Sequence, residues 1–218
     1  MTCIESEIKV KRDVILHGLV YPIAPFNAPG KDDLCWWEGF LSDDDINYVL
    51  SRPEWHDSKA AQVGYGSNGE VNQEKRRTNV SWMGVDSKNE HIWQKITNAV
   101  WSANRQFFQF DLTGCYELAQ LGSYTQYDQG HYDWHTDTSL SGSDSPYRKL
   151  SLSLLLSDPS EFEGGELHVK TGSDEVRVLE QKKGRGWFFP SWTLHRVTPV
   201  TKGIRRSLVL WVGGPGFK

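Results

Sequence analysis

A histidine and a carboxylate separated by one residue constrain this chain more than any other feature. In the stretch HYDWHTDTSL (131–140), His135 and Asp137 are two positions apart. On a β-strand, residues i and i+2 point to the same face and lie about 6–7 Å apart. Two such side chains can coordinate one metal ion, but a third ligand is needed to hold it. The stretch therefore predicts a strand that carries part of a metal site.

A third ligand is available further along the chain. His195 lies in PSWTLHRVTPV (190–200), within a region of short predicted strands. Two histidines and one carboxylate on one face leave coordination positions open, and this is the ligand set of non-haem Fe(II) oxygenases. The remaining histidines lack such a partner pattern, and we interpret them as surface, hydrogen-bonding or structural residues: His17, His56, His91, His131 and His168.

An arginine follows His195 after ten residues, in KGIRRSLVLWV (202–212). Alternation along a strand would place two sets of side chains on opposite faces, with Arg205, Ser207 and Val209 on one and Arg206, Leu208 and Leu210 on the other. A guanidinium that points into an apolar barrel needs a carboxylate partner. A dicarboxylic co-substrate that chelates the metal at one end would offer that carboxylate at its other end.

The order of the expected elements indicates the fold class. Apolar residues recur at helical spacing in two segments, FLSDDDINYVLSR (40–52) and NEHIWQKITNAVWSANRQFF (89–108). We expect Ser42 or Asp43 to cap the first, and Ile92, Ile96, Val100 and Trp101 to share one face of the second. From about residue 116 the period changes to that of short strands, among them a half-buried strand in KLSLSLLLSD (149–158). Helices followed by many strands predict helices packed on an antiparallel sandwich or barrel.

Net charge, cysteine spacing and apolar runs indicate which partners and which cellular location to expect. The formal net charge is −4, and the only dense basic cluster is KRR (75–77), so we expect no nucleic-acid partner held by charge. The three cysteines are far apart and form no CxxC pair, which is typical of reduced thiols in a cytoplasmic protein. No signal-peptide core or membrane span is apparent, so we expect a soluble protein without a membrane partner.

Three segments together resemble a known family: YTQYDQGHYDWHTD (124–137), FEGGELHV (162–169) and GRGWFFPSWTLHRVTPVTKGIRRSLVLWV (184–212). They are similar to the 2-oxoglutarate/Fe(II)-dependent dioxygenases, and in particular to the prolyl 4-hydroxylase-like branch that includes the PKHD-type hydroxylases. The resemblance implies a mainly β fold with supporting α-helices, the double-stranded β-helix or jelly roll. It also implies three parts, namely an N-terminal extension (1–34), a helical support region packed on the core (35–115) and the dioxygenase domain (116–218).

The resemblance also implies roles for individual residues. His135, Asp137 and His195 match the iron ligands, and Arg205 matches the partner of the distal carboxylate of 2-oxoglutarate. Some relatives place a second contact for this carboxylate on a tyrosine in the strand that here reads SLSLLLS; without that tyrosine, Ser207 is the candidate.

Three further residues are assigned through the same resemblance. Tyr127 matches a tyrosine that lines the co-substrate pocket, and Trp211 matches a tryptophan that lies near the substrate proline. Arg77 lies where relatives present a strand on the substrate side, and we expect it to face the mouth of the cleft. The GGEL turn (164–167) fits a hairpin of the family and has a structural role.

The expected function is hydroxylation of a C–H bond by Fe(II) and 2-oxoglutarate, with succinate and CO₂ as co-products and ascorbate as a reductant of the iron. The substrate expected from the resemblance is a prolyl residue in a peptide or protein, or a proline-like amino acid. One alternative keeps this chemistry and acts on a nucleobase or small metabolite. A second is a non-catalytic jelly-roll protein whose tryptophans stack on carbohydrate, and a third is a cupin-like metal enzyme. The last two leave Arg205 without a role.

Overall fold

The computed structural model of the chain describes residues 33–63, 69–138, 146–172 and 174–216. These residues all lie within one unit, Lys31–Lys218. Almost all of the expected N-terminal extension (1–34), with Cys3 and His17, therefore lies outside the described residues.

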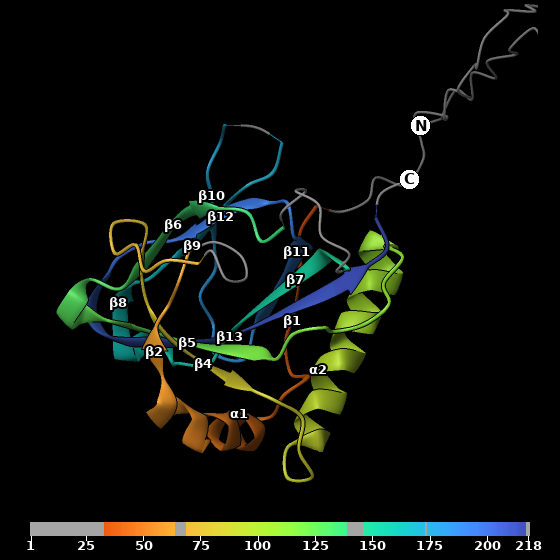
Figure 1. The fold of residues 1–218 in the computed structure, drawn as a ribbon, viewed down its shortest axis with the longest axis horizontal. Coiled ribbons are helices and arrows are strands. Elements are labelled where there is room, and N and C mark those ends of the chain that lie inside the picture. Colours follow the sequence, from red (N-terminus) through yellow and green to blue (C-terminus); the bar gives the residue numbers. More distant parts are fainter. Residues whose placement is uncertain (1–32, 64–68, 139–145, 173, 217–218) are drawn as a thin grey trace, which may run out of the picture. The chain divides into compact units, whose positions relative to one another are not determined.

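Two antiparallel sheets form the fold, and they face each other across an interior space (Figure 1). The larger sheet contains, in order, β1 (Cys35–Trp37), β11 (Gly186–Pro190), β7 (Tyr147–Leu155), β13 (Val200–Gly214), β5 (Ala119–Thr125), β4 (Asn79–Met83) and β2 (Lys59–Ala60), and β8 (Phe162–Gly164) pairs with β13. The smaller sheet contains β10 (Arg177–Leu179), β9 (Leu167–Lys170), β12 (Leu194–Val197), β6 (His131–His135) and β3 (Arg76–Arg77). The predicted fold class, a mainly β jelly roll with supporting helices, is confirmed.

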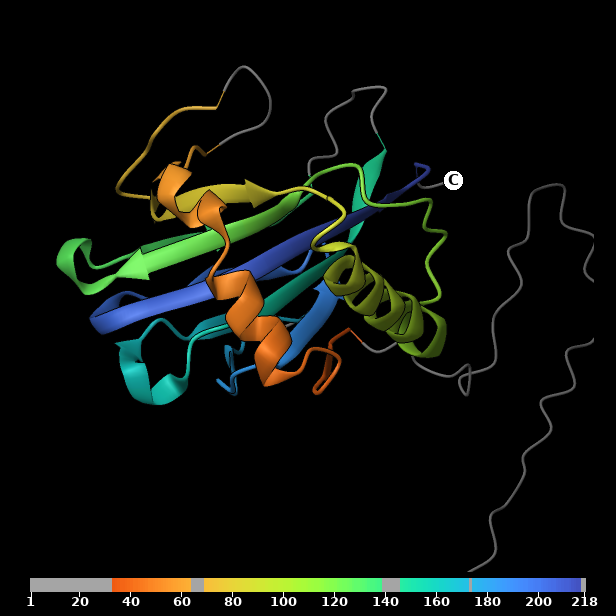
Figure 2. The same ribbon diagram turned by 90° about the horizontal axis from the view of Figure 1, so that it is seen from below.

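Two α-helices, α1 (Asp43–Leu50) and α2 (Glu90–Ala103), cover the face of the larger sheet that points away from the smaller sheet (Figure 2). Ser42 caps α1, as expected, and its hydroxyl and the Asp45 carboxylate satisfy each other's backbone N–H groups in a capping box. Short helical turns occupy Pro53–Asp57, Gln126–Asp128 and Pro159–Glu161, and a π-helical turn occupies Asn104–Phe108. In the part of the chain that the structure describes, no helix combines the length and the apolar character that crossing a membrane requires.

The core is divided by the larger sheet. One apolar cluster fills the space between this sheet and the helices, and it includes Ile46, Ile92, Ile96, Leu152, Leu154 and Phe188. A smaller cluster lies between the two sheets, and it includes Leu167, Val169, Phe189, Val197 and Val200. Because the smaller cluster fills only part of the space between the sheets, room is left there for a cleft.

The expected apolar face of the second helix needs one correction. Ile92, Ile96 and Val100 follow one another at intervals of four residues and are buried, but Trp101 is 64% exposed. One further residue turns the helix by about 100°, which carries the Trp101 side chain away from this row. The α-helix also ends at Ala103 rather than at residue 108.

The strand expected to be half-buried is buried on both faces. In β7, Leu152 and Leu154 belong to the core beneath the helices, while Ser151, on the opposite face, is also fully buried. The prediction of one solvated face was wrong because the second sheet covers the serine side. The segment 35–115 likewise contributes strands β1 to β4 as well as both helices, and its separation from residues 116–218 as a support region stays a prediction.

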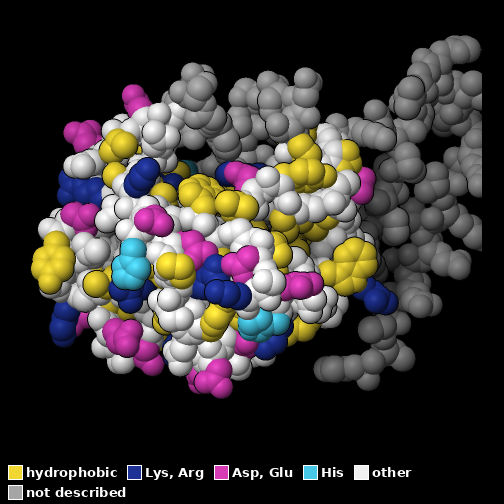
Figure 3. Space-filling view, turned by 60° about the horizontal axis from the view of Figure 1, so that its bottom comes forward, with side chains coloured by type: hydrophobic (Ala, Val, Ile, Leu, Met, Phe, Trp, Pro, Cys, Tyr) yellow, Lys and Arg dark blue, Asp and Glu magenta, His cyan; other side chains and the backbone are white. Residues whose placement is uncertain are grey.

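Charges of both signs are interspersed on the surface. On the face that Figure 3 shows, Lys and Arg side chains lie among Asp and Glu side chains. Among the described residues, ion pairs at the surface include Lys202 with Glu163 and Lys182 with Glu38. Such pairs contribute little to stability individually, and the face as drawn carries no field of a single sign.

Gly203 is a position at which a methyl group should destabilise the fold. Its φ is +70°, and an added Cβ would lie 1.9 Å from the backbone oxygen of Glu161. Gly203→Ala is expected to lower the free energy of unfolding by about 3 kcal/mol, because a left-handed conformation and a backbone clash act together. Urea denaturation measures the change.

Gly172→Ala is the matched control for this prediction. Gly172 has a φ of +78°, but an added Cβ there would meet nothing within 4 Å. The control should therefore show only the conformational cost of about 1–2 kcal/mol. Equal destabilisation by the two substitutions would contradict the role given to the clash.

Candidate metal centre and adjoining cleft

The structure brings His135, Asp137 and His195 together at one end of the smaller sheet. β6 and β12 are antiparallel neighbours, and His135 and His195 are paired in their register. The Nε2 atoms of His135 and His195 lie 3.7 Å and 3.6 Å from the two carboxylate oxygens of Asp137. One donor atom from each of the three residues lies within 4.8 Å of the others. One metal ion could therefore contact all three side chains.

Hydrogen bonds orient each of these side chains. The Nδ1 atoms of His135 and His195 lie 2.8 Å and 2.9 Å from the backbone oxygens of Asp133 and Thr193. A carbonyl oxygen only accepts, so Nδ1 carries the proton and the lone pair of Nε2 is available to a metal. The Ser151 hydroxyl donates to the Asp137 carboxylate over 2.7 Å. The supporting hydrogen bonds of a metal ligand set are thus already in place.

The charge states of these groups suit a divalent cation. Burial lowers the pKa of His135 to about 3, and the nearby His195 acts in the same direction. Burial would raise the pKa of Asp137, but the two histidines, the hydroxyl of Ser151 and the indole of Trp211 together lower it. His135 is therefore neutral and Asp137 ionised near neutral pH, as metal ligands must be. Two imidazoles and one carboxylate form a donor set that fits Fe(II).

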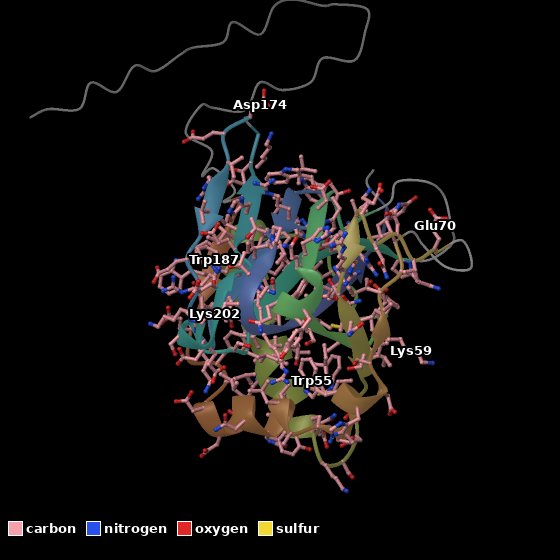
Figure 4. The ribbon with its side chains drawn as sticks, turned by 90° about the vertical axis from the view of Figure 1, so that its left-hand side faces the viewer. Trp55, Lys59, Glu70, Asp174, Trp187 and Lys202 are labelled. Carbon is pink, nitrogen blue, oxygen red and sulfur yellow. The ribbon has the colours of Figure 1, made fainter. Side chains whose placement is uncertain are left out.

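A cleft of about 1130 Å³ opens beside the three residues, and both sheets contribute to its walls. Side chains of β13 at alternate positions line it: Arg205, Ser207, Val209 and Trp211. This is the face that strand alternation predicted. Lys59 of β2 lies at the outer rim, where its side chain extends away from the sheet (Figure 4).

Arg205 is buried in the cleft without a counter-charge. Its side chain is only 3% exposed, and its Nη1 donates to the Ser207 hydroxyl over 3.1 Å. Among the described residues, its Nε has no hydrogen-bond partner and no carboxylate lies within 4.0 Å of the guanidinium. Burial lowers the pKa of this arginine. An anion that enters the cleft would supply the missing partner, so the site fits a co-substrate with a free carboxylate.

The GGEL turn leaves room for this arginine. Gly165 has a φ of +61°, and an added Cβ would lie 2.7 Å from the Cδ of Arg205. A larger residue at this position would displace the aliphatic part of the arginine. The turn thus has the structural role expected of it and also borders the cleft.

Tyr127 does not line the cleft, and that prediction was wrong. The residue lies on the 3₁₀ turn Gln126–Asp128 and is 86% exposed. Tyr124, three residues earlier on β5, is buried and lines the cleft, and the Arg205 guanidinium lies 5.3 Å from the centre of its ring. The turn follows β5 directly and carries Tyr127 off the strand, so this residue does not occupy the pocket position to which the family resemblance matched it.

Arg77 is also placed differently from the prediction. Its guanidinium donates to the backbone oxygens of Gln73 and Asp128, and it is not among the described residues that line the cleft. Arg76 lines the cleft instead. Adjacent residues of a strand point to opposite faces, so an error of one residue exchanged the two arginines.

Aromatic side chains form another part of the wall. Trp211 is buried, and the guanidinium of Arg148 lies 3.9 Å from the centre of its ring. The ring centre of Trp82 lies 6.2 Å from that of Trp211, and Trp82 is 42% exposed. Trp82 was not predicted from the sequence to be part of the site. Arg148 is ion-paired with Glu117, and its Nη1 also donates to the backbone oxygen of Asp137. The predicted substrate-side tryptophan therefore lies beside the metal ligands.

Comparison with known proteins adds independent findings. Residues 121–213 match the model of the 2OG-Fe(II) oxygenase superfamily. A PKHD-type hydroxylase from Gloeothece citriformis is 39% identical over 90 residues, which are 41% of this chain and 40% of that protein. The PKHD-type hydroxylase YbiX of Shigella flexneri is 28% identical over 181 residues, 80% of this chain and 75% of that protein. For the first curated relatives that it matches, the chain spans about two fifths of their length.

Solved structures share the fold. A prolyl-4-hydroxylase of Pseudomonas putida is 18% identical with a TM-score of 0.64, over 84% of this chain and 94% of that one. A prolyl hydroxylase of Trichoplax adhaerens, in complex with a peptide fragment of the oxygen degradation domain of hypoxia inducible factor, is 17% identical with a TM-score of 0.65, over 83% of each chain.

Proposed function

We propose that this chain is a 2OG-Fe(II) oxygenase of the PKHD type and that it hydroxylates a C–H bond of a prolyl residue in a peptide or protein, or of a proline-like amino acid. In this reaction 2-oxoglutarate loses CO₂ and becomes succinate, one atom of O₂ enters succinate, and the other enters the substrate as hydroxyl. The observation that carries the proposal is the meeting of His135, Asp137 and His195 in the same cleft as the buried, unpaired Arg205.

The three residues would hold Fe(II), which supplies the activation of O₂ and the oxidising power for C–H hydroxylation. The protein's part is to fix their orientation. The backbone oxygens of Asp133 and Thr193 hold the two imidazole rings, and Ser151 holds the carboxylate. Ser151 in turn lies 2.9 Å from the hydroxyl of Ser191. Such supporting contacts raise metal affinity and fix the tautomer of each ring.

Arg205 and Ser207 would bind the distal carboxylate of 2-oxoglutarate. Their side chains lie on one face of β13 and are hydrogen-bonded to each other. Tyr124 closes this part of the cleft beneath the guanidinium. A charge pair enclosed between two sheets is shielded from water, which strengthens it. Residues 116–218 would thus form the catalytic domain, and residues 35–115 would support it. Ascorbate would sustain turnover by keeping the iron reduced.

A prolyl substrate is supported by the aromatic part of the cleft wall and by the relatives. Trp211 and Trp82 offer aromatic faces to a pyrrolidine ring. The solved structures with this fold include prolyl hydroxylases, one of them bound to a peptide.

One experiment tests the proposal directly. The metal-free protein is mixed anaerobically with Fe(II) and 2-oxoglutarate, and the weak visible charge-transfer band of the chelate is recorded. Oxygen is then admitted, and succinate is measured with prolyl peptides, proline, nucleosides and sugars as additions. We expect the band, together with succinate formation stimulated by a prolyl compound. Neither band nor succinate would instead favour a carbohydrate-binding protein, and stimulation by nucleosides alone would assign a different substrate.

A further inference from the structure

We propose that the substrate carries a carboxylate that binds Arg76, an inference that rests on the proposed function and specifies its substrate class. Arg76 lies on β3, at the edge of the smaller sheet, and lines the same cleft as the metal ligands. It is only 8% exposed. Its position and its contacts both indicate a binding site for an anion.

Among the described residues, the side chain of Arg76 contacts neutral groups. Its Nη2 donates to the side-chain oxygen of Gln120 over 2.7 Å, and its guanidinium lies 4.3 Å from the centre of the Tyr132 ring. Its Nε is buried and has no hydrogen-bond partner in the described part of the chain. A guanidinium offers five N–H donors, so this one keeps donor capacity for a ligand.

The buried arginines of the described residues differ in whether a carboxylate pairs with them. Three arginines are buried among the residues that the structure describes: Arg76, Arg185 and Arg205. Arg185 lies away from the cleft and is paired with the carboxylates of Glu38 and Glu180. The two that line the cleft, Arg76 and Arg205, have no carboxylate within 4.0 Å among the described residues. A buried charge without a partner is costly, so the cleft is built to receive two anionic groups.

One of these groups is already accounted for by the co-substrate. The distal carboxylate of 2-oxoglutarate would pair with Arg205, which leaves Arg76 for the second anion. Arg148, also in the cleft, does not compete for that anion in the same way, because Glu117 already neutralises it.

The position of Arg76 relates this second anion to the reacting carbon. The His135 ring stacks on Tyr132 with 3.4 Å between ring centres, and Arg76 lies 4.3 Å from the same ring. Groups this close to one ring must occupy its opposite faces, so a single aromatic ring separates the guanidinium from a metal ligand. A carboxylate bound there would belong to the reacting residue or to its immediate neighbour in a peptide.

A carboxylate is the anion that best matches this site in a prolyl substrate. The planar guanidinium binds carboxylates through two parallel hydrogen bonds. The source could be the α-carboxylate of a free amino acid, the C-terminus of a peptide that ends in proline, or an acidic side chain beside an internal proline. All three sources offer a carboxylate to the guanidinium. Comparing each acid with its amide distinguishes one source from another.

The test compares acids with their amides. Three pairs are used: proline with prolinamide, a peptide ending in proline with its C-terminal amide, and a peptide with Glu beside proline with its Gln counterpart. In at least one pair we expect kcat/KM to be ten- to hundredfold higher for the acid, as for a charge-assisted hydrogen bond. Affinity for the anaerobic Mn(II)–2-oxoglutarate complex, measured by calorimetry, should show the same preference without turnover.

Substitutions assign the preference to Arg76. In Arg76→Met the ratio between acid and amide should fall to about one, and Arg76→Lys should restore part of it because the charge is retained. Arg77→Met is the matched control, since the guanidinium of this neighbour donates to the backbone oxygens of Gln73 and Asp128, which are not among the described residues that line the cleft, and it should keep the full preference.

The outcomes separate this inference from the function on which it rests. A wild-type protein without the chelate band and without succinate formation would overturn the proposed function. A protein that forms the band and hydroxylates a prolyl compound, yet treats acid and amide alike in all three pairs, would overturn only the role of Arg76. This comparison needs no variant, so it holds even if Arg76→Met fails to fold.

Discussion

Asp137→Ala should abolish metal-dependent turnover and weaken metal binding by about a thousandfold. The substitution removes the only carboxylate of the ligand set and leaves two imidazoles that face each other without an anion between them. Removal of one buried charged partner costs roughly 3–5 kcal/mol, and each 1.4 kcal/mol corresponds to a tenfold change in affinity. Calorimetric titration with Mn(II) and the anaerobic chelate band measure the effect.

Asp133→Ala is the control for this loss. Asp133 lies on β6, two residues before His135, and is exposed, and its backbone oxygen accepts the hydrogen bond from the His135 ring. The control should bind metal as the wild type does. Retention of full metal affinity by Asp137→Ala would exclude these three residues as the metal site.

Arg205→Met should raise the concentration of 2-oxoglutarate needed for the chelate band by roughly a hundredfold or more. The substitution removes the buried charge that we assign to the distal carboxylate, and truncation of one partner in such a pair typically costs 2–5 kcal/mol. The band should return at high 2-oxoglutarate, because the metal ligands are untouched.

Arg206→Met is the neighbouring control. Arg206 points to the other face of β13, where its guanidinium lies 5.7 Å from the centre of the Trp55 ring. Its replacement should leave the affinity for 2-oxoglutarate unchanged. If Arg205→Met bound 2-oxoglutarate as tightly as the wild type, the co-substrate would have to lie elsewhere.

Local sequence periodicity was sufficient to predict much of the site. The HxD pair and a later histidine in the strand region predicted the three residues that meet, although Asp137 lies two residues beyond the end of β6 and not on the strand. Alternation along β13 predicted that Arg205, Ser207 and Val209 share a face, whereas Trp211 was matched through the family resemblance. The argument from alternation succeeds along β13 because the period of a strand is fixed by its backbone and does not depend on its neighbours.

Predictions that depend on where a strand begins or ends were less secure. The 3₁₀ turn at Gln126–Asp128 carries Tyr127 out of the pocket, and a shift of one residue places Arg76 rather than Arg77 in the cleft. The burial of Ser151 depends on a second sheet that the strand's own sequence does not reveal. Each of these features is set by tertiary contacts, so no local pattern could identify it.

The position of β3 at the edge of the smaller sheet has a consequence for evolution. Two of the three candidate metal ligands, His135 and His195, lie on β6 and β12, which have neighbours on both sides, whereas β3 borders only β6. Mutations in an edge segment disturb fewer surrounding residues than mutations in an interior strand. Paralogues are therefore expected to diverge first along this margin, acquiring new preferences while the proposed metal centre is inherited unchanged.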